Sequence, residues 1–160
     1  MIQETIQAKW TTDTQSKIYH DSINIRYNVF IVEQKFPEGS DIDALEEESE
    51  HLVLYNQKQE PLATARIIEL EDHWYRIERV AVSKSARKLG LGKILIQQIE
   101  ERVLKNGGKA ITLNSESEAI GFYEKHGYNK IGAEYLDYHI MHQKMIKIFN
   151  PSINRRECND

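Results

Sequence analysis

The stretch Ile77–Lys93, with the sequence IERVAVSKSARKLGLGK, decides how the rest of the chain is interpreted. It begins with a short run typical of a strand, Val80–Val82, and ends where an amphipathic helix is expected to begin. Gly90 and Gly92 leave backbone N–H groups uncovered beside that helix start, where the helix dipole adds positive potential. The stretch therefore predicts a strand, a turn suited to an anion such as phosphate, and a helix.

Neither of the commoner phosphate-binding motifs fits this turn. A Walker A loop needs a glycine five residues before Gly92 and a Ser or Thr after Lys93, but the chain has Arg87 and Ile94 there. A dinucleotide-binding fingerprint needs a third glycine where the chain has Leu95. The simplest alternative is that the two glycines only form a tight turn.

Composition limits the class of protein. The 160 residues suffice for one domain with its own core, and 40% hydrophobic and 29% charged residues are usual for a globular protein. A net charge of −4 without a basic stripe argues against nucleic-acid binding. No run approaches the roughly 18 apolar residues of a membrane span, so we expect no membrane contact either.

Two terminal features point to the cytoplasm. Cys158 is the only cysteine, so no intrachain disulfide can form, which fits a reducing compartment. The first residues, MIQETIQAKW, lack the cationic start and apolar core of a signal peptide. We predict a cytoplasmic protein with a single domain over residues 1–150 and a polar tail over residues 151–160.

The hydrophobic pattern predicts an α+β succession of strands and helices. In chain order we expect an edge strand (5–9), a helix (14–32), three antiparallel strands (51–56, 62–70, 74–82), a helix from 91 to a stop at 106–108, a buried strand (110–113), a helix (117–126) and a final hairpin (128–135, 138–145). The buried strand is expected to run parallel to the strand before the helix, which makes a βαβ unit.

An acidic run separates the first helix from the strands. Six of the ten residues from 41 to 50 are acidic. Such a run usually forms a solvated helix or loop face. The functional alternative is a negative field that draws in an amine.

Two local motifs resemble a known family. Arg87, Gly90 and Gly92 fill the fixed places of (Arg or Gln)-x-x-Gly-x-(Gly or Ala), the acyl-CoA signature of the GNAT acetyltransferase superfamily. The segment 122–128, FYEKHGY, is similar to that family's F-Y-E-K-x-G-F ending. The order of expected elements also resembles the GNAT acyl-CoA N-acyltransferase fold over nearly the whole chain. The resemblance implies a central mixed, mostly antiparallel sheet flanked by helices.

The N-terminal half resembles one branch of the superfamily, the ElaA/YjcF-like branch. The matching positions are VFIVEQ at 29–34, Asp41 with Asp43, His51 with Leu52, and His139 with Ile140. One position departs from the pattern: Glu116 stands seven residues before the helix tyrosine, where the superfamily commonly has Asn and this branch Gln. The resemblance therefore does not carry over an amide contact to CoA at that position.

The resemblance implies transfer of the acetyl group of acetyl-CoA directly to an amine of a small molecule or protein. Backbone amides of Leu89–Lys93 would hold the pyrophosphate, and the edge of Val80–Val82 would pair with the pantetheine arm. The implied cofactor-binding residues are Val80, Ala81, Val82, Arg87, Lys88, Leu89, Gly90, Leu91, Gly92, Lys93, Asn114 and Tyr123.

The reaction would need a proton donor for the leaving thiolate and a base for the amine. The resemblance implies Tyr123 as the donor; the alternative is a core tyrosine with a satisfied hydroxyl. For the base we rank Glu78 first, because it alternates with Val80 along one strand face. The alternative for Glu78 is a salt bridge with Arg76 or Arg79.

Glu33 and His51, from the branch-like segments, rank second and third as bases and are also expected on the substrate-binding side. We predict no metal, because the spacing of His139 and His142 sends strand side chains to opposite faces.

Two other classes of function remain open: a non-catalytic acyl-CoA-binding sensor, and an acidic protein-interaction domain with a non-functional glycine turn. The acceptor and the oligomeric state are also open, with a homodimer as one option.

Overall fold

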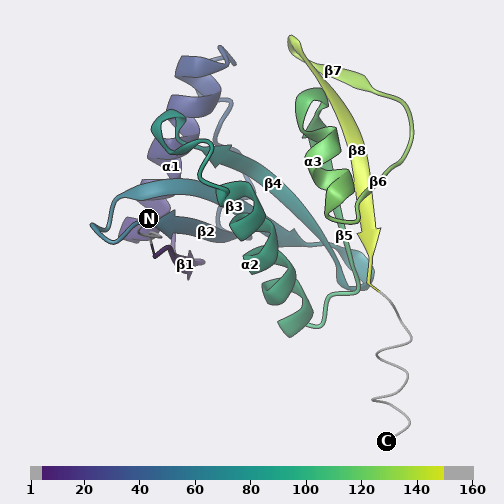
Figure 1. Ribbon diagram of the computed structural model, residues 1–160, viewed down its shortest axis with the longest axis horizontal. Coiled ribbons are helices and arrows are strands. Elements are labelled where there is room, and N and C mark those ends of the chain that lie inside the picture. Colours follow the sequence, from purple (N-terminus) through teal and green to yellow (C-terminus); the bar gives the residue numbers. More distant parts are fainter. Residues whose placement is uncertain (1–4, 150–160) are drawn as a thin grey trace, which may run out of the picture. The chain divides into compact units, whose positions relative to one another are not determined.

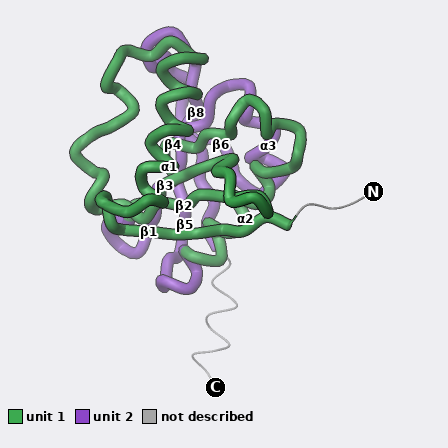
Figure 2. The backbone as a smooth tube through the Cα atoms, turned by 90° about the vertical axis from the view of Figure 1, so that its left-hand side faces the viewer, with its two compact units in different colours: residues 1–68, 77–102 green, residues 69–76, 103–160 purple. Residues whose placement is uncertain are grey.

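The computed structural model describes residues 5–149, which separate into two compact units (Figures 1 and 2). Within the described residues, unit 1 combines residues 5–68 with 77–102, and unit 2 combines residues 69–76 with 103–149. The polar tail expected over 151–160, including Cys158, lies outside the described residues.

Unit 1 is built on antiparallel strands. They are β1 (Gln7–Thr11), β2 (Glu50–Tyr55), β3 (Pro61–Glu69) and the second half of β4 (Trp74–Val82). β2 pairs with β1 on one side and with β3 on the other, with Leu52 opposite Trp10 and Ala65. The run Leu52–Tyr55 is buried throughout, as a central apolar strand requires. The strands expected over 51–56, 62–70 and 74–82 are therefore confirmed to within one residue.

The first helix changes its winding halfway along. α1 (Lys17–Arg26) begins at Ser16, whose hydroxyl accepts a hydrogen bond from the Tyr19 N–H. The chain then continues as a π-helix, η1 (Tyr27–Glu33). Ile25 and Val29 pack against Val53, Tyr55 and Ala81 of the strands. The expected helix over 14–32 is confirmed as a helical segment, but its second half is π rather than α, which apolar spacing does not distinguish.

The helix that follows the decisive turn is α2 (Leu91–Lys105), preceded by the 3-10 helix η3 (Lys84–Ala86). Its first part, up to Arg102, belongs to unit 1 and buries Leu91, Leu95 and Ile99, which recur at the spacing of one helix face. After α2 ends, the Gly108 N–H donates to the Val103 carbonyl at 2.8 Å. A Cβ on Gly108 would stand 2.4 Å from the Val103 side chain, so only glycine fits there.

Unit 2 is organised around β8 (Ile140–Ile148). The other elements are β5 (Ala110–Glu116), the 3-10 helices η2 (Glu71–His73) and η4 (Ser117–Ala119), α3 (Ile120–Lys125), β6 (Asn129–Lys130) and β7 (Tyr135–Asp137). β5, β6 and β7 all pair antiparallel with β8. The first arm of the expected hairpin is therefore two short strands, separated around Gly132, whose φ is +76°. The expected helix over 117–126 is α only from Ile120.

Candidate active site

The start of α2 has the geometry of an anion-binding turn. Gly90 has a φ of +75°, and a Cβ placed on it would meet no atom within 4 Å. Lys88 also has a positive φ, 71°. The first turn of α2 contains no acidic side chain, and the first four N–H groups of a helix have no partner within the helix. A phosphate group therefore fits this turn, with backbone donors in front of it and open space beside Gly90.

The signature arginine contacts the end of β4 and the end of η1. The Arg87 guanidinium donates to the Val82 carbonyl from Nε at 3.1 Å and from Nη2 at 3.0 Å. It also forms a two-pronged ion pair with Glu33, in which Nη2 lies 2.7 Å from Oε1. The Arg87 hydrogen bonds hold the pKa of Glu33 below its usual value. The sequence prediction named both residues but did not pair them.

The strand before the turn has one unusual backbone conformation, just before its proposed binding segment. Arg79 has a φ of +55°, which is uncommon for a residue other than glycine. Its side chain donates to the Asp41 carbonyl at 3.3 Å and to Asp43 Oδ2 at 3.1 Å. Of the next three residues, Ala81 is buried while Val80 and Val82 are half-buried.

Glu78 is held by an arginine of the neighbouring strand. Arg66 donates to Glu78 Oε1 from Nε at 3.1 Å and from Nη2 at 2.8 Å. The sequence analysis had considered Arg76 or Arg79 as the salt-bridge partner. Arg66, a partner that the local sequence does not suggest, lies on β3, so pairing of the strands decides this contact.

Arg66 belongs to a buried ion network that fixes the acidic run. Its side chain is 1% exposed and also contacts Asp43 at 2.7 Å and Glu46 at 2.8 Å. Arg26 of α1, equally buried, contacts Glu46 at 2.7 Å and also donates to the Asp41 carbonyl. Burial has the largest single effect and raises the pKa of Glu46, but the hydrogen bonds and charge of Arg26, the Asp43 N–H and the charge of Arg66 together outweigh it, so the net pKa is lowered.

The acidic run over residues 41–50 is thus only partly solvated, whereas its composition predicts a solvated face. Glu46 is buried against arginines and Asp43, although partly exposed, also contacts Arg66, while Glu47 and Glu48 are exposed. The sequence does contain a signal for this arrangement. Arg26 recurs within the buried stripe of the first helix, and Arg66 stands within an apolar strand, so both need buried anions.

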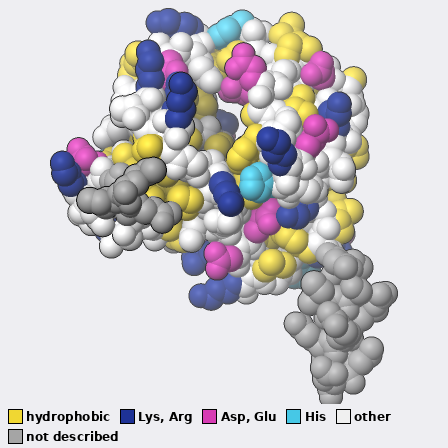
Figure 3. Space-filling view, in the orientation of Figure 1, with side chains coloured by type: hydrophobic (Ala, Val, Ile, Leu, Met, Phe, Trp, Pro, Cys, Tyr) yellow, Lys and Arg dark blue, Asp and Glu magenta, His cyan; other side chains and the backbone are white. Residues whose placement is uncertain are grey.

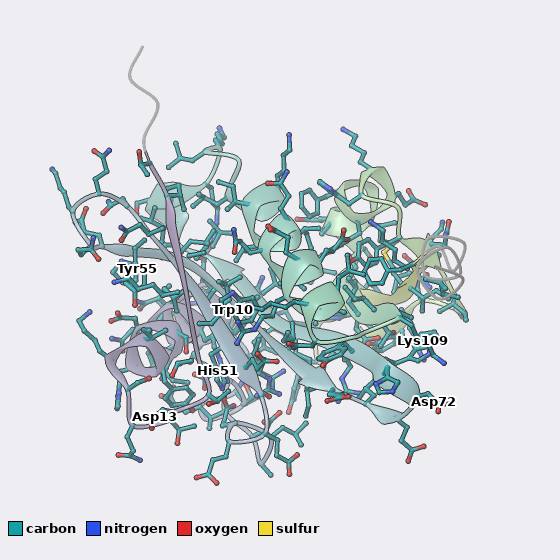
Figure 4. The ribbon with its side chains drawn as sticks, turned by 90° about the horizontal axis from the view of Figure 1, so that it is seen from below. Trp10, Asp13, His51, Tyr55, Asp72 and Lys109 are labelled. Atoms are coloured by element: carbon teal, nitrogen blue, oxygen red, sulfur yellow. The ribbon has the colours of Figure 1, made fainter. Side chains whose placement is uncertain are left out.

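His51 lies inside unit 1, on β2 (Figure 4). It is fully buried, its ring meets the Tyr19 ring edge-on at 4.9 Å, and its Nε2 lies 2.9 Å from the Glu46 carbonyl. Its Nδ1 has no hydrogen-bond partner among the described residues. Burial lowers the pKa of His51, so the neutral ring is favoured.

The remaining predicted residues belong to unit 2. Tyr123 of α3 is 6% exposed and packs edge-on against Phe122 and Tyr128. Within residues 5–149 no group is hydrogen-bonded to its hydroxyl. Burial, with a smaller effect of the Glu116 charge, raises the pKa of Tyr123 to about 12. Asn114 is exposed on β5, opposite Lys144.

Residues 5–149 contain neither a metal-binding cluster nor a helix that could cross a membrane. No group of three or more His, Cys, Asp or Glu side chains in that range has an arrangement that could hold a metal ion. No helix described in the same range has the length and apolar character needed to cross a membrane.

Hollows and charges on the surface do not by themselves mark the site. A hollow of about 680 Å³ in unit 2 is lined by residues such as Trp74 and Ile146, and none of the predicted site residues lines it. A second hollow, of about 410 Å³, lies in unit 1. Figure 3 shows side chains of both charges interspersed with hydrophobic ones over the visible face.

The class of protein follows from comparison with known families. A model described as Acetyltransferase (GNAT) domain matches residues 26–149, and the chain therefore belongs to the GNAT acetyltransferase family. The Bacillus subtilis (strain 168) protein named uncharacterized N-acetyltransferase YjcF is similar, with 37% identity over 128 residues that cover 79% of this chain and 90% of the relative.

Solved structures agree with this assignment. An acyl-CoA N-acyltransferase from Pseudomonas aeruginosa matches with a TM-score of 0.79 and 25% identity, over 90% of this chain and 99% of that one. Escherichia coli ElaA matches with a TM-score of 0.74 and 22% identity, over 89% and 99%. The expected α+β GNAT fold and the resemblance to the ElaA/YjcF-like branch are confirmed.

Proposed function

We propose that this protein transfers the acetyl group of acetyl-CoA directly to an amine of a small molecule or protein. The observation that carries the proposal is the turn before α2, where Gly90 leaves open space in front of uncovered helix donors. Membership of the GNAT acetyltransferase family supports an acyl-CoA as the donor.

In this proposal the chain holds the co-substrate mainly through its backbone. The amides of Leu89–Lys93 bind the pyrophosphate, with charge added by Lys88 and Arg87. The edge of Val80–Val82 receives the pantetheine arm as an added strand. Asn114 is proposed as a further contact. Acetyl-CoA supplies an activated acetyl group, so the protein has only to orient it and move protons.

The amine must lose a proton before it attacks the thioester carbonyl, because an alkyl amine with a pKa of about 10.4 is mostly protonated at neutral pH. Glu78, oriented by Arg66, is proposed as the first base, acting directly or through water. Glu33 and His51 rank behind it: Glu33 is ion-paired to Arg87, and His51 is fully buried.

The thiolate of CoA leaves as the new amide bond forms, and Tyr123 is proposed to protonate it. A pKa of about 12 keeps the phenol protonated at neutral pH, which a proton donor requires. The hydroxyl also has no hydrogen-bond partner among residues 5–149.

The proposal is tested by incubating the protein with acetyl-CoA and a library of amines, measuring free thiol and acetylated product together. We expect equal amounts of both for at least one amine. Tyr123→Phe should lower kcat by at least about tenfold with little effect on CoA affinity, while Tyr135→Phe, at an exposed tyrosine of the same unit, should behave as wild type. A wild-type rate for Tyr123→Phe would remove Tyr123 from the mechanism.

A second candidate function is an acyl-CoA-binding sensor without turnover. The observation that favours it is that Glu78 and Glu33 are both ion-paired to arginines, which a working base does not need. CoA binding without thiol release across the whole library would support the sensor. The amine acceptor, the cytoplasmic location and a homodimer stay predictions.

A further inference from the structure

The hollow of about 410 Å³ in unit 1 is an acidic pocket that the proposed function does not use. One wall is formed by Ile23, Asn24, Tyr27 and Asn28, a separate face of the first helix from its buried stripe. The other wall is the segment 38–42, which brings two carboxylates. We call this hollow the α1 pocket.

Asp41 is the buried carboxylate of the α1 pocket. The residue is 4% exposed. Its backbone carbonyl accepts hydrogen bonds from Arg26 and Arg79, which fixes the residue in place. No residue between 5 and 149 donates a hydrogen bond to its carboxylate. Its oxygens keep contact with solvent rather than being sealed inside the protein, and the residue lines the pocket, so the carboxylate is open to a donor from a ligand there.

The nearby arginines do not supply the missing charge. Arg26, Arg66 and Arg79 are three cations, and they contact the carboxylates of Asp43, Glu46 and Glu78, which are three anions. Asp41 therefore adds negative charge to a network that is already balanced.

Both carboxylates of the pocket, those of Glu38 and Asp41, affect the hydroxyl of Tyr27. Its hydroxyl donates to Glu38 Oε1 at 2.8 Å. The pKa of Tyr27 is raised, chiefly because of that hydrogen bond and also because of the negative charges of Glu38 and Asp41. The negative charges of the two carboxylates are therefore both felt at the Tyr27 hydroxyl, on an aromatic ring that lines the pocket.

The lining favours an organic cation over a bare metal ion. The ring of Tyr27 can face a cationic group, and the side chains of Ile23 and Ile42 offer apolar contact to a carbon chain. The volume lies in the range of small-molecule sites. Two carboxylates match a ligand with more than one positive centre.

We propose that the α1 pocket binds an alkyl polyamine, with one of its ammonium groups donating to the Asp41 carboxylate and its carbon chain lying against Tyr27 and Ile42. The inference goes beyond the proposed function, because acetyl-CoA binding does not require this pocket.

The test is a calorimetric titration of the full chain with spermidine at constant ionic strength and without acetyl-CoA. We expect saturable binding, and a loss of affinity of at least about tenfold in Asp41→Asn. Glu48→Gln removes the same charge from an exposed position of the acidic run and should change affinity by less than about twofold. Glu38→Gln changes a residue at the exposed rim of the pocket. It should weaken spermidine binding while leaving the packing of the buried residues unchanged.

Absence of spermidine binding, or equal affinity in Asp41→Asn and wild type, would overturn the proposal. So would binding of magnesium or calcium chloride that depends on Asp41 when spermidine does not bind. Because no acetyl-CoA is present, the result does not depend on whether the chain transfers acetyl groups, and failure of one proposal can be told from failure of the other.

Discussion

At the start of α2, the position of a glycine, rather than its backbone conformation, distinguishes the proposed binding turn from an ordinary one. Gly90 has a φ of +75° with open space where a Cβ would stand, and Gly132 in unit 2 has nearly the same conformation, +76°, also in open space. The two glycines therefore carry the same backbone strain when replaced, but only one faces the proposed phosphate site.

We expect Gly90→Ala to lower the affinity for CoA by at least about tenfold, because the added methyl group enters the space that the pyrophosphate would use. Gly132→Ala should leave that affinity unchanged. Both variants should lose about 1 kcal/mol of unfolding free energy. Calorimetry with CoA and urea unfolding check the pair, and equal CoA affinity in both variants would contradict the role of Gly90.

His51 gives a prediction for pH. Burial lowers its pKa in the folded protein, whereas in the unfolded chain it takes up a proton near pH 6.5. The contribution of His51 to the unfolding free energy is therefore fully present above about pH 6.5 and declines as the pH falls below that value. His51→Phe should flatten this decline in urea unfolding between about pH 6.5 and 5.5; an unchanged slope would show that His51 is not the group responsible.

Single residues also show which contacts the sequence can predict and which it cannot. Arg87, Gly90 and Gly92 could be found because their spacing is local and a family pattern contains them. The contact between Glu78 and Arg66 could not, because it depends on pairing of separate strands. The contact between Arg87 and Glu33 joins residues 54 positions apart, and no local spacing encodes it.

Among the elements, the acidic run is held to α1 and β3 by the buried arginine network. Breaking a buried ion pair from one side leaves an uncompensated charge, whereas an exposed pair contributes little. Arg66→Met should therefore lower the unfolding free energy by about 3 to 5 kcal/mol.

The matched control is Lys17→Met, which removes the exposed partner of Asp21. It should change the unfolding free energy by less than about 1 kcal/mol. Guanidinium unfolding of both variants checks the contrast. A similar small loss in both would mean that the network does not stabilise the acidic run.

Elements could be predicted where the spacing of apolar residues is regular. The prediction was wrong in detail where backbone hydrogen-bond geometry decides the structure. The buried stripe of α2 and the run of β2 follow directly from their side chains. The π winding of η1 and the division of the last hairpin around Gly132 depend on hydrogen-bond geometry, which the pattern of apolar residues does not contain.

At the scale of the whole molecule, the fold class followed from two short motifs and the order of elements. The tertiary placement of the acidic run did not follow from composition. The acidic run offered a negative field for an amine as its functional alternative, but the structure divides its acidic residues into partners of the buried arginines and others, including Asp41. Only the latter are candidates for an external cation.

The central claim is that the amides at the start of α2 and the edge of β4 bind acetyl-CoA. The most direct measurement is a titration of ¹⁵N-labelled protein with CoA, following each backbone amide by NMR. We predict that the largest shifts lie at Leu89–Lys93 and Val80–Val82, and that Gly90→Ala abolishes them at the same CoA concentration. Saturating CoA that leaves these amides unshifted, or shifts only amides elsewhere, would contradict the account.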